Sequence, residues 1–514
     1  MEDIIIRGGW IIDGTGKDRY KGDVAVSNGV ITKIGDLKGL QAREYLDAAN
    51  LIVSPGFIDA HAHSDTCFLQ DDSCASKLYQ GITLEVTGQC GDSPFPGQEG
   101  DGEWQTASFD AFVRKFENEG RRMAVHQAIM MGHGSLRAAV MGYEDRKPTD
   151  EEMSKMKALL DESLAQGVWG MSMGLEYAPG FFANREELAQ LGEVVKRHDG
   201  VVTCHMRSEG RQIFDALGEL IDVGKASGVR VHASHLKIDH YSMHGQADKV
   251  WQVIENAREK GVRITADVYP FTASCTSLTI RCPKWSLDGG NEALLAHLSG
   301  ARRQDVIEGI RTHYFNAERA DTCFFCDDGG LWPQIVGRTL RDVAENDLHT
   351  TDYAWAAAEI LMRTRARVNC IFFVMDEGDM LYFLEKGVSI GSDGWALSGD
   401  PKKVEGKPHP RSYAAVSEFL RIAREKKICT LEEAVRRITS AEADVLGMRD
   451  RGRLLAGMKA DITVFDVNLI APRSTYMEPV QLSIGVRHVL VDGCVALRNG
   501  AQTDIRNGKF LRKM

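Results

Sequence analysis

Two histidines separated by one residue end an apolar stretch near the start of the chain. The stretch Phe57-Ile58-Asp59-Ala60-His61-Ala62-His63 is typical of a β-strand, in which alternate side chains project from the same face. A single histidine in such a place is more often a structural core residue, but two imidazoles on one face form the kind of pair that binds zinc. His61 and His63 are therefore predicted metal ligands.

Two further apolar stretches each deliver a histidine near their end. These are His205, in residues 201–207, and His235, in residues 229–235. If the stretches are parallel strands of a barrel, their ends meet at the same face as the first pair, where barrel enzymes place their chemistry. His205 and His235 thus join the predicted ligand set, whereas His232 is expected to be structural.

An aspartate and a cysteine follow two other apolar stretches. Asp393 ends the stretch that begins at Val388, where small neighbours expose it, and beside a metal it can accept a proton from bound water as a general base. Its alternative role is a helix cap. Cys90 lies in Thr87-Gly88-Gln89-Cys90-Gly91, and its thiolate is a suitable zinc ligand, although buried cysteines are commonly inert. Cys323 and Cys326 form the one CxxC pair, which is expected to be incidental.

The elements that must position these residues alternate between short apolar runs and amphipathic stretches. Such alternation is typical of βα units around a parallel sheet. Eight strands are predicted, at 57–63, 83–87, 125–131, 168–173, 201–207, 229–235, 263–269 and 388–393. Helices are predicted at 149–166, 185–198 and 247–260, the first with a capping-box start. The pattern predicts an α/β fold with a (β/α)8 TIM-like barrel.

Both ends of the chain have another texture, with short strands separated by turns. We expect them to form one small β-sandwich domain from residues 1–56 and 450–514, beside a barrel at 57–449. The gap between the seventh and eighth predicted strands is too long for an ordinary loop, so an inserted lid segment is predicted at 283–348.

The composition limits the function classes. The chain has 514 residues, of which 43% are hydrophobic and 26% charged, and its net charge of −11 disfavours a nucleic-acid partner. No run approaches the ~20 apolar residues that span a membrane, and the N-terminus does not read as a signal peptide. Eleven cysteines without framework spacing suit reduced thiols. We therefore expect a cytoplasmic protein without nucleic-acid or membrane partners and leave its oligomeric state open.

The residues above resemble the amidohydrolase superfamily, through residues 55–63, the two later histidines and the Asp393 stretch. More closely, the chain resembles the N-acyl-D-amino-acid deacylases, or D-aminoacylases. That resemblance rests on strings spread over nearly the whole chain: Gly132-His133-Gly134-Ser135-Leu136-Arg137, Gly174-Leu175-Glu176-Tyr177-Ala178-Pro179-Gly180, His205-Met206-Arg207-Ser208-Glu209-Gly210, Ser234-His235-Leu236-Lys237, Asp267-Val268-Tyr269-Pro270, Gly391-Ser392-Asp393-Gly394 and Pro408-His409-Pro410-Arg411.

The resemblance implies a zinc-dependent barrel. Many superfamily members bridge two metals with a carboxylated lysine on the fourth strand, but residues 168–173 contain no lysine, so Cys90 is the expected substitute. The resemblance further implies a tight zinc site formed by Cys90, His205 and His235. It also implies a second, weaker site formed by His61 and His63. The number of bound metals is left open.

The resemblance also assigns substrate-binding residues. Lys237, Tyr269 and Arg411 match positions that hold the substrate carboxylate. Lys237 and Tyr269 also suit this role by their places at strand ends, whereas Arg411 could equally be a solvated loop arginine. Arg281 lies near the position of an arginine in family members that act on acidic side chains, and it would favour a D-glutamate- or D-aspartate-type substrate; a surface arginine is the equal alternative.

The predicted reaction is hydrolysis of a small N-acyl-D-amino acid to a carboxylate and a free D-amino acid. Zinc activates water, and Asp393 accepts its proton and passes it to the leaving amine. One alternative is a cyclic-amide hydrolase of dihydropyrimidinase or dihydroorotase type, which the missing fourth-strand lysine disfavours. Others are a deacylase of larger D-residue conjugates and a non-catalytic relative, although the latter is expected to lose ligands that this sequence keeps. The side-chain preference and acyl length are left open.

Overall fold

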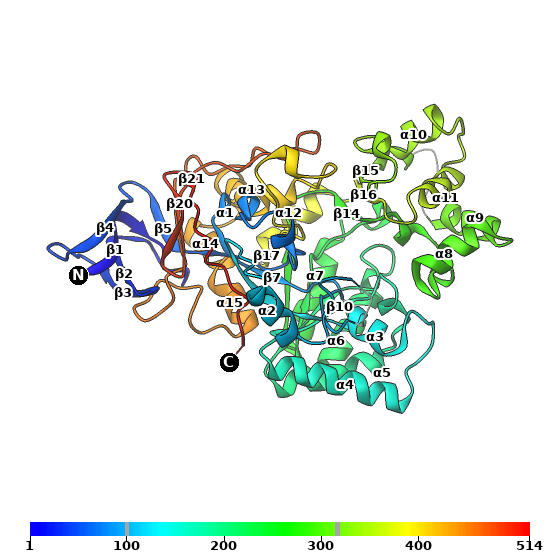
Figure 1. Cartoon of the computed structure of the whole chain (residues 1–514), viewed down its shortest axis with the longest axis horizontal. Helices are drawn as coiled ribbons and strands as arrows, with labels where there is room; N and C mark the ends of the chain where they lie inside the picture. Colours follow the sequence, from blue (N-terminus) through cyan, green and yellow to red (C-terminus); the bar gives the residue numbers. More distant parts are fainter. Residues whose placement is uncertain (98–101, 314–318, 514) are drawn as a thin grey trace.

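The computed structural model describes residues 1–97, 102–313 and 319–513. Within these ranges, both ends of the chain build one nine-stranded sheet (Figure 1). Its strands are β1 (Glu2–Ile11), β2 (Tyr20–Ser27), β3 (Val30–Gly35), β4 (Ala42–Asp47), β5 (Ile52–Pro55), β18 (Ile462–Phe465), β19 (Val486–Val491), β20 (Cys494–Arg498) and β21 (Ala501–Gln502). The two ends join where β5 pairs antiparallel with β18, with Val53 opposite Val464. The exact limits of the predicted domains stay a prediction.

The barrel is built from strands that overlap the eight predicted ones. In the described part of the chain they are β6 (Phe57–Asp59), β7 (Ile82–Thr87), β8 (His126–Ile129) continued by β9 (Met131–Gly132), β10 (Gly170–Gly174), β11 (Val201–His205), β12 (Arg230–Ala233), β13 (Ile264–Val268) and β17 (Ser389–Ile390). The paired strands are parallel, and a parallel bridge between Ala62 and Gly394 links the ends of β6 and β17. The predicted barrel is confirmed.

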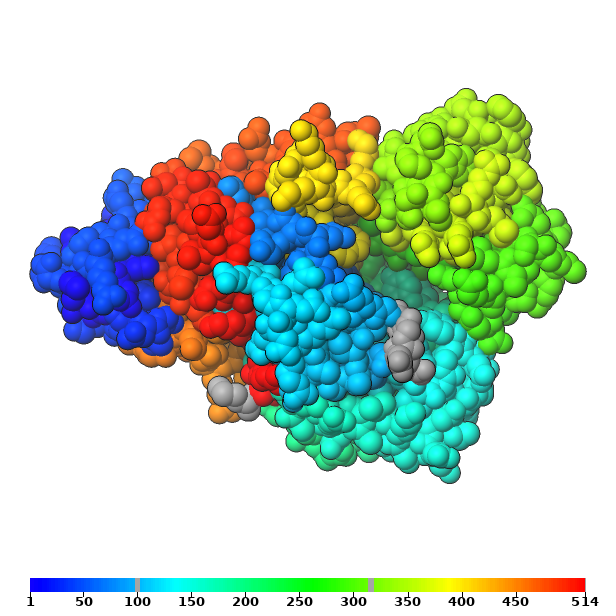
Figure 2. Space-filling model, viewed as in Figure 1, coloured from blue at the N-terminus to red at the C-terminus, as the bar shows by residue number. Residues whose placement is uncertain are grey.

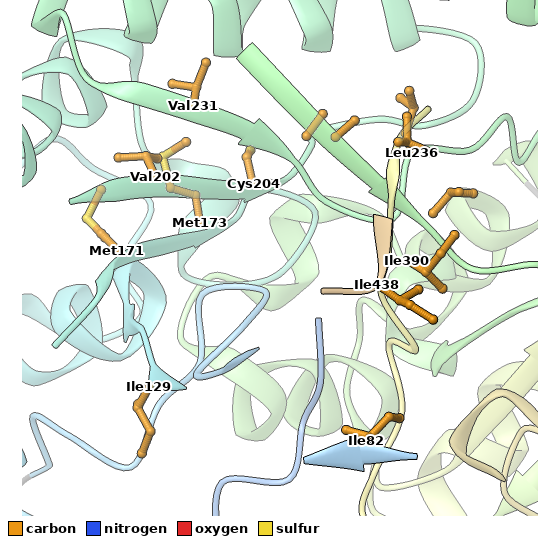
Figure 3. Close-up of a cluster of buried hydrophobic side chains, with 14 of the residues drawn as sticks. Ile82, Ile129, Met171, Met173, Val202, Cys204, Val231, Leu236, Ile390 and Ile438 are labelled. Carbon is orange, nitrogen blue, oxygen red and sulfur yellow. The ribbon is translucent and has the colours of Figure 1, made fainter. Parts of the chain in front are cut away.

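Alternation along the strands separates an apolar layer from the functional interior. Met171 and Met173 of β10 lie opposite Val202 and Cys204 of β11, and Figure 3 shows these side chains within one buried cluster. That cluster also contains apolar residues of the surrounding helices. Because alternate side chains of a strand point to opposite faces, His205 faces the interior of the barrel.

Helices surround the barrel strands in the order that the sequence predicts. They are α1 (Ala75–Leu78), α2 (Phe109–Asn118), α3 (His133–Met141), α4 (Asp150–Ala165), α5 (Arg185–Arg197), α6 (Ile213–Ser227), α7 (Ala247–Glu259), α12 (Glu377–Glu385), α13 (Arg411–Lys426), α14 (Leu431–Arg437) and α15 (Ser440–Leu446). The expected capping box is present between Thr149 and Glu152 at the start of α4. Among the described residues, no helix is both long enough and apolar enough to cross a membrane.

A separate lobe interrupts the barrel between β13 and β17. Its elements are the strands β14 (Ser274–Ser277), β15 (Cys323–Asp327) and β16 (Asn369–Phe372) and the helices α8 (Gly290–Ser299), α9 (Arg303–His313), α10 (Leu340–Asn346) and α11 (Tyr353–Arg363). The lobe has an apolar core largely of its own, and Figure 2 shows it in green, projecting from the rest of the molecule. The predicted insertion at 283–348 covers α8 to α10 but not the three-stranded sheet's outer strand β14 or its central strand β16.

Candidate metal and substrate site

Four of the predicted ligands converge at the carboxyl ends of the barrel strands. The Cys90 sulfur, just beyond β7, lies 3.3 Å from His61 Nε2, 3.4 Å from His235 Nε2 and 3.6 Å from His205 Nδ1. The thiol therefore stands between one imidazole that follows β6 and two that come from β11 and the loop after β12.

These separations fit a zinc ion. With bonds of about 2.3 Å to sulfur and 2.0–2.1 Å to nitrogen, a tetrahedral zinc holds its sulfur and nitrogen ligands about 3.5 Å apart. The distances from Cys90 to the three imidazoles lie close to that value. Thiolate and imidazole are also the donor types that zinc prefers, so the donor set and its spacing agree.

Two glutamates orient two of the imidazoles from behind. Glu209 accepts a hydrogen bond at 3.0 Å from His235 Nδ1, and Glu176 accepts one at 2.9 Å from His205 Nε2. In each ring the other nitrogen points at Cys90, which is how metal-binding histidines are usually held. Neither glutamate is predictable from the sequence as part of the site, because each lies in a loop after its strand, where no alternation shows which way a side chain points.

His61 and His63 are held differently. Within the described residues, His61 Nδ1 is buried without a hydrogen-bond partner, and the nearest Asp267 oxygen is 3.9 Å away. His63 Nε2 lies 3.0 Å from Asp393 Oδ1, while the His61 and His63 rings are 5.3 Å apart. The second predicted site thus has a carboxylate beside it but lacks the paired support of the first.

Asp393 stands at the centre of the remaining polar contacts. One carboxylate oxygen faces His63 and lies 3.6 Å from His61 Nε2. The other oxygen forms an ion pair with Arg411 at 2.8 Å. Burial opposes ionisation, but the Arg411 charge, with the nearby imidazoles, holds the pKa of Asp393 well below its usual value. The carboxylate is therefore ionised and able to accept a proton.

Two imidazoles of the cluster, those of His61 and His235, are kept neutral. Burial and the neighbouring His235 lower the pKa of His61 well below its usual value, and burial and Lys237 do the same for His235. A neutral imidazole has the free lone pair that a metal requires. Burial raises the pKa of the Cys90 thiol, and a bound zinc would reverse this by favouring the thiolate.

Unusual backbone conformations aim three of these side chains. Cys90, His235 and Asp393 have φ angles of 53°, 37° and 50°, in the left-handed region that side chains other than glycine rarely adopt. Such strain is often concentrated at functional sites. Gly391 makes room beside them, since a Cβ there would lie 2.6 Å from His61 Cβ.

A buried ion network lies beneath His61. Lys77 of α1 donates to Asp59 and to Ser392, each at 2.8 Å, and lies 3.2 Å from Glu85. Asp59 accepts a hydrogen bond at 2.7 Å from the Ser392 N–H, next to Asp393. Because these residues come from β6, α1, β7 and the loop after β17, the network fixes the relative positions of the strand ends.

The three predicted carboxylate-binding residues lie together. The Lys237 ammonium is 5.8 Å from the centre of the Tyr269 ring and the Arg411 guanidinium is 4.8 Å from it. Lys237 and Arg411 line the main cavity, and Lys237 also forms an ion pair with Glu209. The Tyr269 hydroxyl donates to Met375 Sδ at 3.8 Å, so it is the Tyr269 ring, and not the hydroxyl, that lies near the two cations.

Arg281 lies in the lobe, in the 3-10 turn after β14. It is buried, and its guanidinium stacks on the Phe372 ring at 4.3 Å. Its charge acts on Asp239, which lines the cavity, although burial and Glu176 together raise the pKa of Asp239 to about 6. Arg281 is therefore not a surface arginine, which was the alternative prediction.

A cavity of about 510 Å³ joins these groups. Its wall includes Cys90, His63, Asp393 and Arg411 from the barrel and Ser274 to Ser277 with Asn369 from the lobe sheet. The lobe therefore contributes to the wall of the cavity that also holds the predicted ligand cluster. This volume is in the range of small-molecule sites.

The sequence matches the model of the Amidohydrolase family over residues 44–297 and 389–496. The matched ranges contain Cys90, the three histidines around its sulfur, and Asp393, and they leave out residues 298–388. The chain belongs to the amidohydrolase family.

Relatives of known activity match almost the whole chain. It is 32% identical to the N-acyl-D-glutamate deacylase of Alcaligenes xylosoxydans xylosoxydans, covering 99% of this chain and 96% of the relative. It is 30% identical to the D-aminoacylase of the same organism, covering 99% and 98%. The crystal structure of N-acyl-D-glutamate deacylase from Bordetella bronchiseptica, complexed with zinc and a phosphonate mimic of the tetrahedral intermediate, superposes with a TM-score of 0.84 at 31% identity over 99% of both chains. Within the amidohydrolases, the chain is thus a member of the N-acyl-D-amino-acid deacylase, or D-aminoacylase, family.

Proposed function

We propose that this protein is a zinc-dependent N-acyl-D-amino-acid deacylase, which hydrolyses the linear amide to a carboxylate and a free D-amino acid. The observation that carries the proposal is one cavity that holds a zinc-type ligand cluster, an ionised Asp393 and two cations, Lys237 and Arg411. The full-length similarity to deacylases of N-acyl-D-amino acids supports it.

We propose one tight zinc site and a second, weaker one. Cys90, His205 and His235 would hold the tight ion, because both of their imidazoles are oriented by a glutamate. His61 and His63 would contribute to the weaker site on the other side of the sulfur. When bound, zinc supplies a Lewis acid that lowers the pKa of water and polarises the amide carbonyl.

Asp393 is the proposed general base. Its carboxylate is ionised, buried and held by Arg411 on the side away from His63, so one oxygen faces the ligand cluster. It accepts a proton from the attacking water and gives it to the amide nitrogen as the carbon–nitrogen bond breaks.

Lys237 and Arg411 are proposed to bind the substrate carboxylate, with Tyr269 beside them. Lys237 already pairs with Glu209, and Arg411 already pairs with Asp393. The substrate carboxylate would become a further partner that both cations share. Three substituents of the substrate α-carbon would be fixed in this way. Lys237 and Arg411 form a clamp for the carboxylate, the ligand cluster holds the acyl carbonyl, and the lobe contacts the side chain. Three fixed contacts are what selection of one hand requires.

Arg281 is the proposed determinant for acidic side chains. It follows Ile280, which lines the cavity, and its charge acts on Asp239, which lines the cavity as well. Arg281→Met should lower kcat/KM for N-acetyl-D-glutamate by about 10- to 100-fold, as loss of a charged hydrogen bond does, and should change N-acetyl-D-leucine less. An equal effect on both substrates would remove Arg281 from the selective role.

Amine release from matched N-acetyl-D and N-acetyl-L forms of Glu, Asp, Met and Leu, with zinc supplied, tests the proposal. Release from D forms alone is the expected result. Dihydrouracil and hydantoin test the cyclic-amide alternative, and acylated D-residue peptides test larger conjugates. Activity on cyclic amides, with none on any linear D form, would overturn the proposal. A cytoplasmic location is proposed from the odd number of cysteines, which suits a reducing compartment.

A further inference from the structure

Two cysteines of the lobe sheet lie in contact at the edge of the cavity. Cys275 of β14 and Cys326 of β15 are free thiols whose sulfurs are 3.6 Å apart. Both cysteines are buried, but Cys275 is among the residues that line the main cavity and Cys326 is not. Neither belongs to the ligand cluster or to the carboxylate clamp, so the proposed reaction uses neither thiol.

The surroundings of Cys275 favour a thiolate. The hydrogen bond with the Cys326 thiol and the nearby Arg411 charge lower the pKa of Cys275, although burial opposes them. The same contact raises the pKa of Cys326 well above its usual value, and in the hydrogen bond between the two thiols either sulfur can be the donor. Arg411 also donates at 3.2 Å to the Cys275 carbonyl, which ties the cysteine to the side of the cavity where the clamp lies.

Other buried thiols are in a different situation. Burial raises the pKa of Cys282 to about 12 and that of Cys204 well above its usual value, and neither lines the cavity. Cys90 does line the cavity, but a zinc ion would occupy its sulfur. Reactive cysteines are recognised by a nearby cation and by a path for the reagent. Among these four, only Cys275 has a free sulfur, a place on the cavity wall and the Arg411 charge nearby.

We propose that Cys275 is a reactive thiol through which small electrophiles and peroxides modify the protein from inside the cavity. With hydrogen peroxide, the sulfur attacks one oxygen, a sulfur–oxygen bond forms and the oxygen–oxygen bond breaks. The sulfur loses two electrons to become a sulfenic acid, and the released hydroxide takes up a proton to become water. With iodoacetamide, a sulfur–carbon bond forms, iodide leaves and the thiol proton goes to solvent.

Modification should block the cavity. Cys275 belongs to the wall that carries Arg411, so a group added to its sulfur should take up space beside the clamp. This consequence for turnover rests on the proposed deacylase function. The chemical reactivity of Cys275 is independent of that function, because it is measured from the mass of the modified peptide.

The experiment treats the zinc-loaded protein with a small excess of iodoacetamide and maps the labelled cysteines by mass spectrometry over time. Cys275 should be labelled at least about tenfold faster than Cys204 or Cys282, since each unit of pKa changes the thiolate fraction tenfold. Cys326→Val should slow labelling of Cys275 by several-fold, because it removes the thiol that contacts the Cys275 sulfur and can donate to it. Cys494→Ser, at a partly exposed cysteine of β20, is the matched control and should leave that rate unchanged.

Activity is followed in parallel, each variant being compared with its own starting value. Wild type should lose turnover as Cys275 is labelled, and Cys275→Ser should resist both iodoacetamide and peroxide. Labelling of Cys275 no faster than that of Cys204 would overturn the proposal. So would equal inactivation of wild type and Cys275→Ser. If no substrate is turned over at all, the deacylase proposal fails, while the labelling rates still decide the role of Cys275.

Discussion

Two clusters of histidine and aspartate lie at opposite ends of the barrel strands. At the carboxyl ends, His61, His235 and Asp393 surround Cys90. At the base, His126 at the start of β8 lies 3.5 Å from Asp461 and 3.7 Å from Asp492, both of the terminal sheet module. By residue type alone, either group could hold a metal ion.

The position of the cations distinguishes the two clusters. At the base, Arg451 lies between the carboxylates and pairs with both Asp461 and Asp492. In the cavity, Arg411 and Lys237 contact the carboxylates of Asp393 and Glu209, and Lys237 also lies 2.9 Å from His235 Nδ1. The Cys90 sulfur faces the other nitrogen of His235 and the Nε2 of His61 directly. The base is thus a closed charge network, and the cavity cluster is a set of converging donors.

The protonation of the histidines follows the same division. The two base carboxylates raise the pKa of His126 against the effect of burial, whereas burial and neighbouring positive groups lower those of His61 and His235. A histidine near carboxylates is therefore not by itself a metal ligand. The deciding feature is whether its lone pair faces other donors.

The largest effect is expected from Cys90, the shared centre of the cavity cluster. Cys90→Ala should abolish tight zinc binding and lower turnover by more than about 10⁴-fold, because metal activation of water exceeds any single proton-transfer contribution. Zinc content by mass spectrometry and amine release measure the two effects. Stoichiometric zinc with normal turnover in this variant would show that the cluster does not depend on the thiol. Cys494→Ser is the control.

Asp393→Asn should lower turnover by about 10²- to 10⁴-fold, the usual contribution of a general base. Zinc bound through Cys90, His205 and His235 should remain. Asp92→Asn provides a matched control, since Asp92 lines the same cavity but contacts Ser135. Near-normal turnover by the Asp393 variant, measured with full zinc occupancy, would exclude its role as the base.

Arg451→Met tests the base cluster and should act on stability alone. Removing the cation leaves Asp461 and Asp492 buried without their main partner, which costs about 3–5 kcal/mol for a buried ion pair. Urea unfolding measures this loss, while kcat/KM and zinc content should match wild type. A fall in zinc content equal to the fall in stability would mean that the base cluster also serves the metal site.

The stability supplied by Arg451 should depend on pH in a defined direction. Although burial opposes it, Arg451 helps hold the pKa of Asp461 below its usual value, so this aspartate stabilises the fold at pH above about 3.9, its unfolded value. That contribution is lost as the pH falls through the lower folded pKa. The difference between wild type and Arg451→Met should therefore be full at pH 7 and shrink below about pH 4.

Glu209→Gln should weaken zinc binding by about 10- to 100-fold, the usual effect of losing a carboxylate behind a metal-binding histidine. The glutamine keeps the size of the side chain but no longer supplies the charge beside His235 and Lys237. Glu176→Gln makes the same change behind His205. Competition with a chelator gives both affinities, and unchanged affinity in the two variants would remove the distinction between the tight and weak sites.

The sequence predicted the converging donors because they follow strands. Alternation predicted that His61 and His63 share one face, and strand ends predicted that His205 and His235 reach the same face of the barrel. Glu209 and Glu176 could not be assigned in this way, since a loop has no period that tells which way a side chain points. The Arg451 network was equally hidden, because its partners come from segments that meet only in the folded chain.

Lys509→Met should have the smallest effect, although Lys509 also pairs with Asp492 in the base cluster at 2.8 Å. The Lys509 side chain is 58% exposed, against 6% for Arg451, so water already solvates its charge. Ion pairs with an exposed partner contribute about 0–1 kcal/mol, and urea unfolding should show a change within that range. A loss as large as that of Arg451→Met would mean that position in the network, and not burial, determines what each cation contributes.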